Sequence, residues 1–232
     1  MNKYYFAILT ASMISAASYA EVSATITGVT DYIYDGVSQS DNGAALQGSI
    51  DYSKDQFYAG IWTSNIDSPD PDYQQEIDYY IGWADSINDR VGYDVSVLYY
   101  QYPGTDDDLD YDYIEYLAKL TIDNFWIQAG YNPNYFGDTG RAWLARIGHN
   151  YAINDTYTLE VELGTHKMTE RDGDGFWFNH DKYNYWKIGV SRQIMTLDVN
   201  LSYTDTNVSD ENSEEYDDTA REAIVLSVGK TF

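Results

Sequence analysis

Apolar and polar residues alternate with a period of two along most of the chain. Tyr93, Val95 and Val97, for example, would share one face of a strand, with Asp94 and Ser96 on the other. The alternation recurs in segments at 76–83, 114–122, 125–132, 157–164, 185–191, 197–204 and 224–229, and more weakly at 22–34, 44–52, 57–65 and 141–151. The pattern predicts about twelve strands of roughly 9–11 residues, the length that a tilted strand needs to cross a bilayer.

Short and long connections alternate between these strands. Short connections are expected near 53–56, 86–91, 123–124, 152–156 and 193–196, and long ones near 35–43, 66–75, 103–111, 133–140, 167–182 and 205–220. This rhythm predicts an all-β fold, a transmembrane antiparallel up-and-down β-barrel with an even number of strands and both termini at the short-turn end. A soluble β-sandwich would explain the alternation but not the rhythm. In the segments at 22–34 and 57–65 apolar residues fall on both parities, so the inward face there stays open.

The first twenty residues predict a secretory signal peptide. Lys3 supplies the positive charge, an uncharged and mostly apolar stretch follows, and Ser18, Tyr19 and Ala20 form a small-x-small cleavage site. The apolar stretch is shorter than a membrane-spanning helix requires. We therefore expect a signal peptide at 1–20, an outer-membrane barrel at 21–232, and export to the outer membrane of a Gram-negative cell.

The composition narrows the classes of partner. The formal charge is −25, with 13 Lys and Arg in all, so we expect no nucleic-acid binding. The 25 tyrosines favour a folded chain over a disordered acidic one, and the absence of cysteine excludes disulfides. The acidic stretches at 106–110 and 205–220 would lie in water at the long-loop end, where they could attract cations that bridge to anionic lipopolysaccharide.

Specific metal and cofactor sites are not expected. Asp106, Asp108, Asp110 and Asp112 have the alternate spacing of a calcium loop, but the glycine at its sixth position and the glutamate at its twelfth are missing. The sequence "DGDG" at 172–175 fails in the same way and indicates a turn.

The inward face of the predicted barrel is polar and carries more acidic than basic residues. If it lines water, it predicts a narrow pore for small solutes that prefers cations. The alternative is that the charges pair with one another and fill a closed interior. The residues predicted to line the pore are Glu76, Asp78, Asp94, Glu115, Lys119, Arg146, Glu160, Glu162, Lys187 and Asp198.

Other functions remain as alternatives. Some outer-membrane barrels are hydrolases, but His149, His166 and His180 have no nearby Ser in a nucleophile motif, so no enzyme is expected. Long loops could also serve an adhesin or a receptor without transport, and the oligomeric state is open. The terminal Phe232 after alternating apolar residues is typical of the signal that the barrel-insertion machinery reads.

Several stretches resemble the TorF-type porin family of Gram-negative bacteria. They are "DGVSQSDNGAALQGSIDY" with the "YAGIW" strand that follows, "EIDYYIGW" at 76–83, "GYDVSVLYYQYPG" at 92–104, "NPNYFG" at 132–137 and the closing "LSVGKTF". The resemblance covers nearly all of the chain after residue 20. It implies an outer-membrane barrel of the porin class and supplies no solute. One departure is Asp35, where members of the family often carry Arg.

Overall fold

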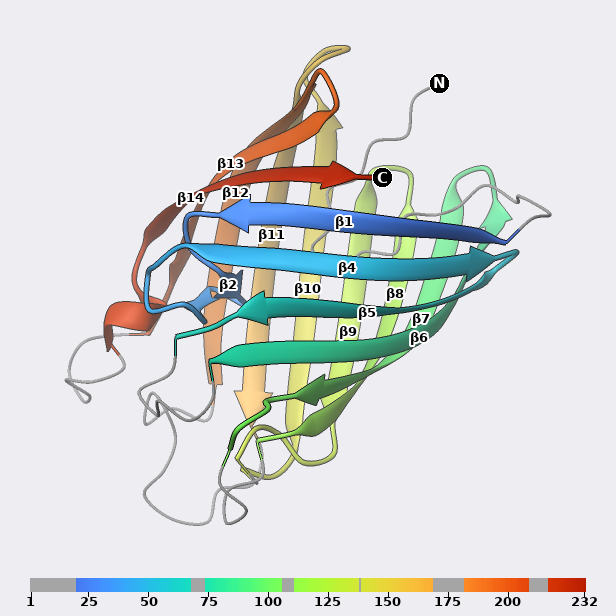
Figure 1. Ribbon diagram of the computed structural model, residues 1–232. Coiled ribbons are helices and arrows are strands. Elements are labelled where there is room, and N and C mark those ends of the chain that lie inside the picture. Colours follow the sequence, from blue (N-terminus) through green and yellow to red (C-terminus); the bar gives the residue numbers. More distant parts are fainter. Residues whose placement is uncertain (1–19, 68–73, 106–110, 138, 169–181, 209–216) are drawn as a thin grey trace.

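The computed structural model describes residues 20–67, 74–105, 111–137, 139–168, 182–208 and 217–232. Twelve strands of this described part form one closed antiparallel barrel, in which β1 pairs with both β4 and β14 (Figure 1). The barrel strands are β1 (Glu21–Val29), β4 (Ala45–Lys54), β5 (Phe57–Asn65), β6 (Gln75–Asn88), β7 (Val91–Gln101), β8 (Tyr113–Ile122), β9 (Phe125–Asn132), β10 (Ala142–Ala152), β11 (Thr158–Met168), β12 (Lys182–Ile194), β13 (Leu197–Thr206) and β14 (Ala223–Thr231). The predicted fold class is confirmed.

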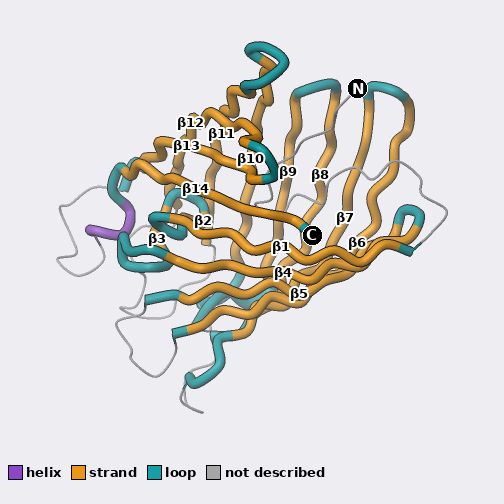
Figure 2. The backbone as a smooth tube through the Cα atoms, turned by 45° about the horizontal axis from the view of Figure 1, so that its top comes forward, coloured by secondary structure: helices purple, strands orange, loops and turns teal. Residues whose placement is uncertain are grey.

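Short turns lie at one end of the barrel and long connections at the other (Figure 2). Asp55, Asp123 and Met195 adopt positive φ angles of 53°, 52° and 55° in three of the tight turns. β1 begins at Glu21 and β14 ends at Thr231, both at this short-turn end, as predicted. The acidic stretch at 106–110, the "DGDG" sequence and residues 209–216 of the stretch at 205–220 lie outside the described residues, as does the predicted signal peptide apart from Ala20.

The sequence prediction of one strand over 22–34 was wrong at its end. β1 stops at Val29, and the chain then forms a separate two-stranded hairpin of β2 (Ile33–Tyr34) and β3 (Val37–Ser38) before β4 begins. A 3₁₀ turn, η1 (Asp217–Ala220), precedes β14. None of the helices in the described residues is long and apolar enough to cross a membrane.

The two faces of the barrel wall differ in polarity. Outward-facing side chains such as Ile81, Ile127 and Leu163 are apolar, yet 50%, 51% and 54% exposed. A belt of exposed apolar side chains around a closed barrel is what a hydrocarbon surrounding requires. The inward positions carry polar residues, tyrosines and glycines instead.

Inward glycines make room for aromatic rings from neighbouring strands. A Cβ added at Gly164 would collide with the ring of Tyr185, and one added at Gly148 would collide with Trp126. The absence of a side chain on one strand therefore lets a large ring from the next lie flat against the wall.

Candidate functional site

The hairpin between β1 and β4 lies inside the barrel. We call residues 31–40 the lumen hairpin. Its turn consists of Asp35 (φ 48°) and Gly36 (φ 85°), the two consecutive positive φ angles of a type I′ turn. Asp31 fixes its base, because Ser38 Oγ donates to Asp31 Oδ1 at 2.6 Å and Ser40 Oγ does so at 3.2 Å.

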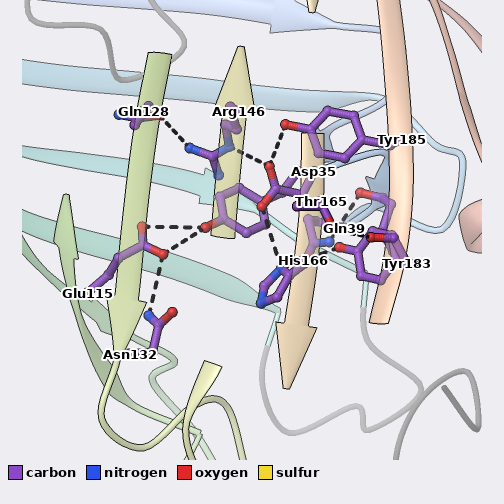
Figure 3. A network of polar contacts seen from close by, with 12 residues as sticks. Asp35, Gln39, Glu115, Gln128, Asn132, Arg146, Thr165, His166, Tyr183 and Tyr185 are labelled. Carbon is purple, nitrogen blue, oxygen red and sulfur yellow. Dashed lines mark hydrogen bonds and ion pairs between the residues drawn. The ribbon is translucent and has the colours of Figure 1, made fainter. Parts of the chain in front are cut away.

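Side chains from four different strands hold the lumen hairpin. Arg146 Nε on β10 donates to Asp35 Oδ1 at 2.7 Å, and the Tyr185 hydroxyl on β12 donates to the same oxygen at 2.8 Å (Figure 3). Tyr34 donates its hydroxyl proton to Glu115 Oε1 on β8 at 3.3 Å. Tyr32 donates to Glu76 Oε1 on β6 at 3.2 Å. Strands β6, β8, β10 and β12 lie around the wall, so a segment that contacts all four crosses the bore.

The ion pair of Asp35 is the strongest of these contacts. The side chains of Arg146 and Asp35 are 13% and 2% exposed, and His166 Nδ1 lies 3.5 Å from Asp35 Oδ2. Burial by itself would raise the pKa of Asp35, but the Arg146 guanidinium and the contact with His166 lower it below its usual range. Asp35 is therefore ionised at neutral pH and attracted to Arg146. At Gly36 a Cβ would lie 2.6 Å from Tyr185 Cβ, so only glycine fits between the turn and β12.

The ten residues predicted to line a pore all lie on the inward face of the wall. The registers pair Asp94 with Lys119 and Glu162 with Lys187, and the alternate positions, such as Val95 and Leu163, carry the exposed apolar side chains of the outer face. Whether they line a conducting pore stays a prediction. They divide into two groups by burial. Glu76, Asp78 and Glu115 are 2%, 0% and 0% exposed, and the following seven are partly exposed: Asp94, Lys119, Arg146, Glu160, Glu162, Lys187 and Asp198.

The sealed group lies beside the lumen hairpin near the long-connection end. Glu115 accepts hydrogen bonds from Tyr34 and from Tyr100, the latter at 2.9 Å. Glu76 Oε2 and both carboxyl oxygens of Asp78 have no hydrogen-bond partner among the described residues.

Aromatic side chains fill the space around this sealed group. Tyr32 packs edge-on against Trp62 with ring centroids 5.4 Å apart, and Tyr100 stacks on Tyr113 at 4.3 Å. Phe136 joins the same buried cluster. The half of the bore at the long-connection end is therefore packed with side chains.

The other half of the bore, toward the short turns, is polar and partly open. Tyr58 donates to Asp94 at 2.8 Å, and Lys119 Nζ lies 4.5 Å from the centroid of the Trp126 ring. The Tyr185 hydroxyl oxygen also lies 2.5 Å from Glu162 Oε1, so its single proton is shared between Glu162 and Asp35. Ser191 Oγ and Asn200 Nδ2 donate to the two oxygens of Glu160 at 2.5 and 3.1 Å. The hydrogen bonds to these carboxylates come from neutral groups, so the donors bring no positive charge into this half of the bore.

Sequence reasoning missed Asp35 and Asp51 as residues of the bore. Asp51 faces inward opposite Gly60 and accepts hydrogen bonds from Ser49 and Tyr80. The alternation of Ile50 and Tyr52 with Ser49 and Asp51 in the sequence indicated that Asp51 faces the bore. For Asp35 the signal was the Asp-Gly pair of a type I′ turn.

Two cavities lie near the site. A cavity of about 30 Å³ borders the lumen hairpin and is lined by Tyr32, Glu76, His166 and neighbouring tyrosines. It has room for one or two water molecules and is too small for a solute. A larger cavity of about 690 Å³ is a groove lined mainly by outward-facing apolar residues of β7 to β11, such as Ala118 and Ala145, so it belongs to the outer wall.

Two of the three histidines lie in the described residues. His166 is 1% exposed and belongs to the network around Asp35, whereas the ring of His149 packs 4.1 Å from Phe125. His180 lies outside the described part. Among the described residues no group of three or more His, Cys, Asp or Glu side chains converges on a point that could hold a metal ion.

Solved outer-membrane porins have the same fold. The KdgM porin matches 90% of this chain and 98% of its own length with 10% identity and a TM-score of 0.54. The NanC porin matches the same shares with 11% identity and a TM-score of 0.55. At such low identity the likeness shows the fold alone.

The family is established by sequence. No curated protein matches the chain. The family model described as "Bacterial protein of unknown function (Gcw_chp)" matches residues 13–232. Since the match spans almost the whole sequence, the chain belongs to the Gcw_chp family of bacterial proteins.

Proposed function

We propose that this protein is an outer-membrane porin-like channel for passive diffusion of small solutes, with a preference for cations. The closed barrel with an exposed apolar outer belt and a polar inner face supports it, and so does the porin fold of the structural neighbours. The resemblance to TorF-type porins and the signal peptide expected at 1–20 agree with export to the outer membrane.

The observation that carries the cation preference is the charge of the partly exposed bore. Five inward carboxylates face it: Asp51, Asp94, Glu160, Glu162 and Asp198. Lys119 and Lys187 are the opposing cations there, since Arg146 is already paired with Asp35. A bore with surplus negative charge concentrates cations and repels anions.

The structural neighbours help to define the solute class by contrast. One of them is described as the KdgM porin in complex with disordered oligogalacturonate, a carboxylate-bearing sugar chain. Acidic side chains along the bore of the present protein would repel such a solute. We therefore propose small cations and small uncharged solutes as its cargo.

Two partners follow from the same proposal. Outer-membrane lipid and lipopolysaccharide would surround the apolar belt. Phe232, 67% exposed and one residue beyond the last strand, would present the terminal signal to the barrel-insertion machinery.

Planar-bilayer recording of the refolded protein tests the channel directly. We expect discrete current steps in KCl. Folded protein that inserts into the bilayer without any conductance would contradict the proposal. That result would favour the second candidate, an occluded barrel with a structural, adhesive or receptor role. The observation that supports this candidate is the half of the bore at the long-connection end, which is packed with side chains.

A further inference from the structure

Among the described residues, the bore is closed only in the part that the lumen hairpin occupies. On β8, Glu115 is 0% exposed beside the hairpin, whereas Lys119, four residues further toward the short turns, is partly exposed. On β10 the side chain of Arg146 lies at the boundary and is 13% exposed. The same wall strands therefore enclose both an open and a sealed region, and the hairpin marks where one gives way to the other.

We propose that the lumen hairpin is the closing element of the channel, held shut by the contacts of Asp35 with Arg146 and Tyr185. Its withdrawal turns the sealed half of the bore into a water-filled path. This inference rests on the proposed channel function and adds to it the residues that decide when and what the channel passes.

The hairpin is attached to the wall mainly through side chains. β2 and β3 pair with each other and with no barrel strand. In the described part of the chain, a single backbone hydrogen bond, from Asp67 N to Gln39 O at 3.0 Å, joins residues 31–40 to segments beyond 44. The pairing of β1 with β4 and β14 does not involve the hairpin. It can therefore leave the bore without breaking the barrel.

The closed arrangement leaves buried polar atoms unsatisfied. Besides Glu76 and Asp78, these include Oδ1 of Asn132 and Nε2 of His166, all within the sealed half. Each such atom costs free energy that water would return if it reached the site. The Asp35 contacts and the aromatic packing thus stabilise the closed state, whereas the unsatisfied polar atoms destabilise it.

Withdrawal of the hairpin also accounts for the chemistry of the wall behind it. Glu76, Asp78 and Glu115 alternate with outward apolar residues as the lining of a wet bore does, yet all three are buried here. Buried carboxyl groups without cationic partners are costly in a permanently dry interior. In an open channel they would face water and extend the acidic lining through the whole bore.

Removal of the ion pair between Asp35 and Arg146 tests the proposal. Asp35→Asn keeps the shape of the side chain and the Asn-Gly pair still favours a type I′ turn, so the hairpin itself stays folded. Arg146 then lacks its counter-ion, and we expect the open fraction of single channels to rise about tenfold or more. A barrel in which residues 31–42 are replaced by a short Gly-Ser linker should stay open. Asp41→Asn, an equal charge change at an exposed position of the same connection, is the matched control.

Cysteine labelling reports the hairpin position without relying on current. The chain has no cysteine of its own, so Asp78→Cys places one thiol behind the hairpin and Asp94→Cys places one in the open half. A charged, water-soluble thiol reagent should modify residue 78 slowly in the otherwise native chain. Modification should become at least about tenfold faster with Asp35→Asn or the linker, while the rate at residue 94 stays the same.

The two measurements separate the gate from the channel. If the Asp35→Asn and linker proteins conduct like the native protein and residue 78 is modified at an unchanged rate, the proposal that the hairpin closes the bore is contradicted. The proposed channel function would be unaffected. Faster labelling at residue 78 without current in any protein would support the hairpin as the closing element and contradict the channel function. Heat-modified mobility on gels identifies the folded barrel in every sample.

Discussion

Arg146 and Asp35, 111 positions apart in the sequence, form an ion pair inside the barrel, with Nε and Oδ1 2.7 Å apart. The pair joins a wall strand to a segment that crosses the bore. Both side chains are almost completely shielded from solvent. The ion pair of Arg90 and Asp123, by contrast, lies in an exposed turn, and its side chains are 72% and 47% exposed. The two pairs have equal charge and very different surroundings.

Arg146→Gln should therefore loosen the lumen hairpin. It leaves the Asp35 carboxylate buried without a counter-ion, a change that costs about 3–5 kcal/mol in comparable pairs. The barrel wall keeps its backbone pairing through β9 and β11. We expect amide exchange at residues 33–38, followed by mass spectrometry, to become about 100-fold faster or more.

Arg90→Gln is the control for that experiment. An exposed ion pair contributes little because water screens it. Exchange in the lumen hairpin should stay at the native rate. Equal acceleration by both substitutions would contradict the assigned role of Arg146.

The docking of the hairpin should depend on pH only in acid. Asp35 belongs to a connection and not to a wall strand, and its pKa in the folded protein is below the usual value. A lowered pKa contributes stability that is present above the unfolded pKa of about 3.9 and is lost as pH falls toward the folded value. Burial raises the pKa of Asp31, so its protonation acts in the opposite direction. Because Asp35 holds the turn to the wall through Arg146, its protonation should decide the outcome. Exchange at residues 33–38, corrected for intrinsic rates, should be constant from pH 7 to about 5 and rise below about 4. A rate that stays constant below about pH 4 would contradict the role of the Asp35 carboxylate.

Gly164→Ala should destabilise the barrel. The new methyl group would overlap the ring of Tyr185, whose hydroxyl is fixed by Asp35 and Glu162, so the ring cannot turn away cheaply. Overpacking of this kind costs about 1–3 kcal/mol. Unfolding in urea from lipid vesicles measures it. Gly28→Ala, with nothing within 4 Å of the added Cβ, should leave the midpoint unchanged or raise it slightly.

If the outer belt faces lipid, a charged residue placed on it should reduce the folding free energy, and the loss should be greatest near the middle of the bilayer. Ile127 faces outward and is 51% exposed, so Ile127→Arg would place a guanidinium against acyl chains and should cost about 2–4 kcal/mol of folding free energy. Asn124→Arg, in the short turn beside it, should be neutral. Equal stability of the two variants in vesicles would show that residue 127 does not face lipid.

Glu160→Gln with Glu162→Gln should reduce the cation preference of the channel. Both carboxylates accept hydrogen bonds from neutral donors, which glutamine can partly replace while it removes the charge. The double variant should conduct with a smaller ratio of cation to anion permeability. Asp155→Asn, an exposed turn position, should keep the native ratio. An unchanged ratio in the double variant would mean that these residues do not face the permeating ions.

Much of the wall was predictable from the sequence. Period-two alternation determines which side chains share a face, and for that reason Glu162 and Lys187 were expected on one face, where the register pairs them. The lumen hairpin was not predicted, because Ile33 continues the alternation of the preceding strand and conceals the turn at Asp35. The partner of Asp35 could not be predicted at all. Its contact with Arg146 depends on the register of the whole barrel, which no local pattern contains.

The reversal potential in a KCl gradient tests the central claim, an acidic bore that conducts ions, most directly. It is measured on the native protein and on the protein whose lumen hairpin is replaced by a linker. The account predicts current in both, with reversal on the cation-selective side and a stronger preference once Glu76, Asp78 and Glu115 are uncovered. Reversal on the anion-selective side, or no current in either protein, would contradict it.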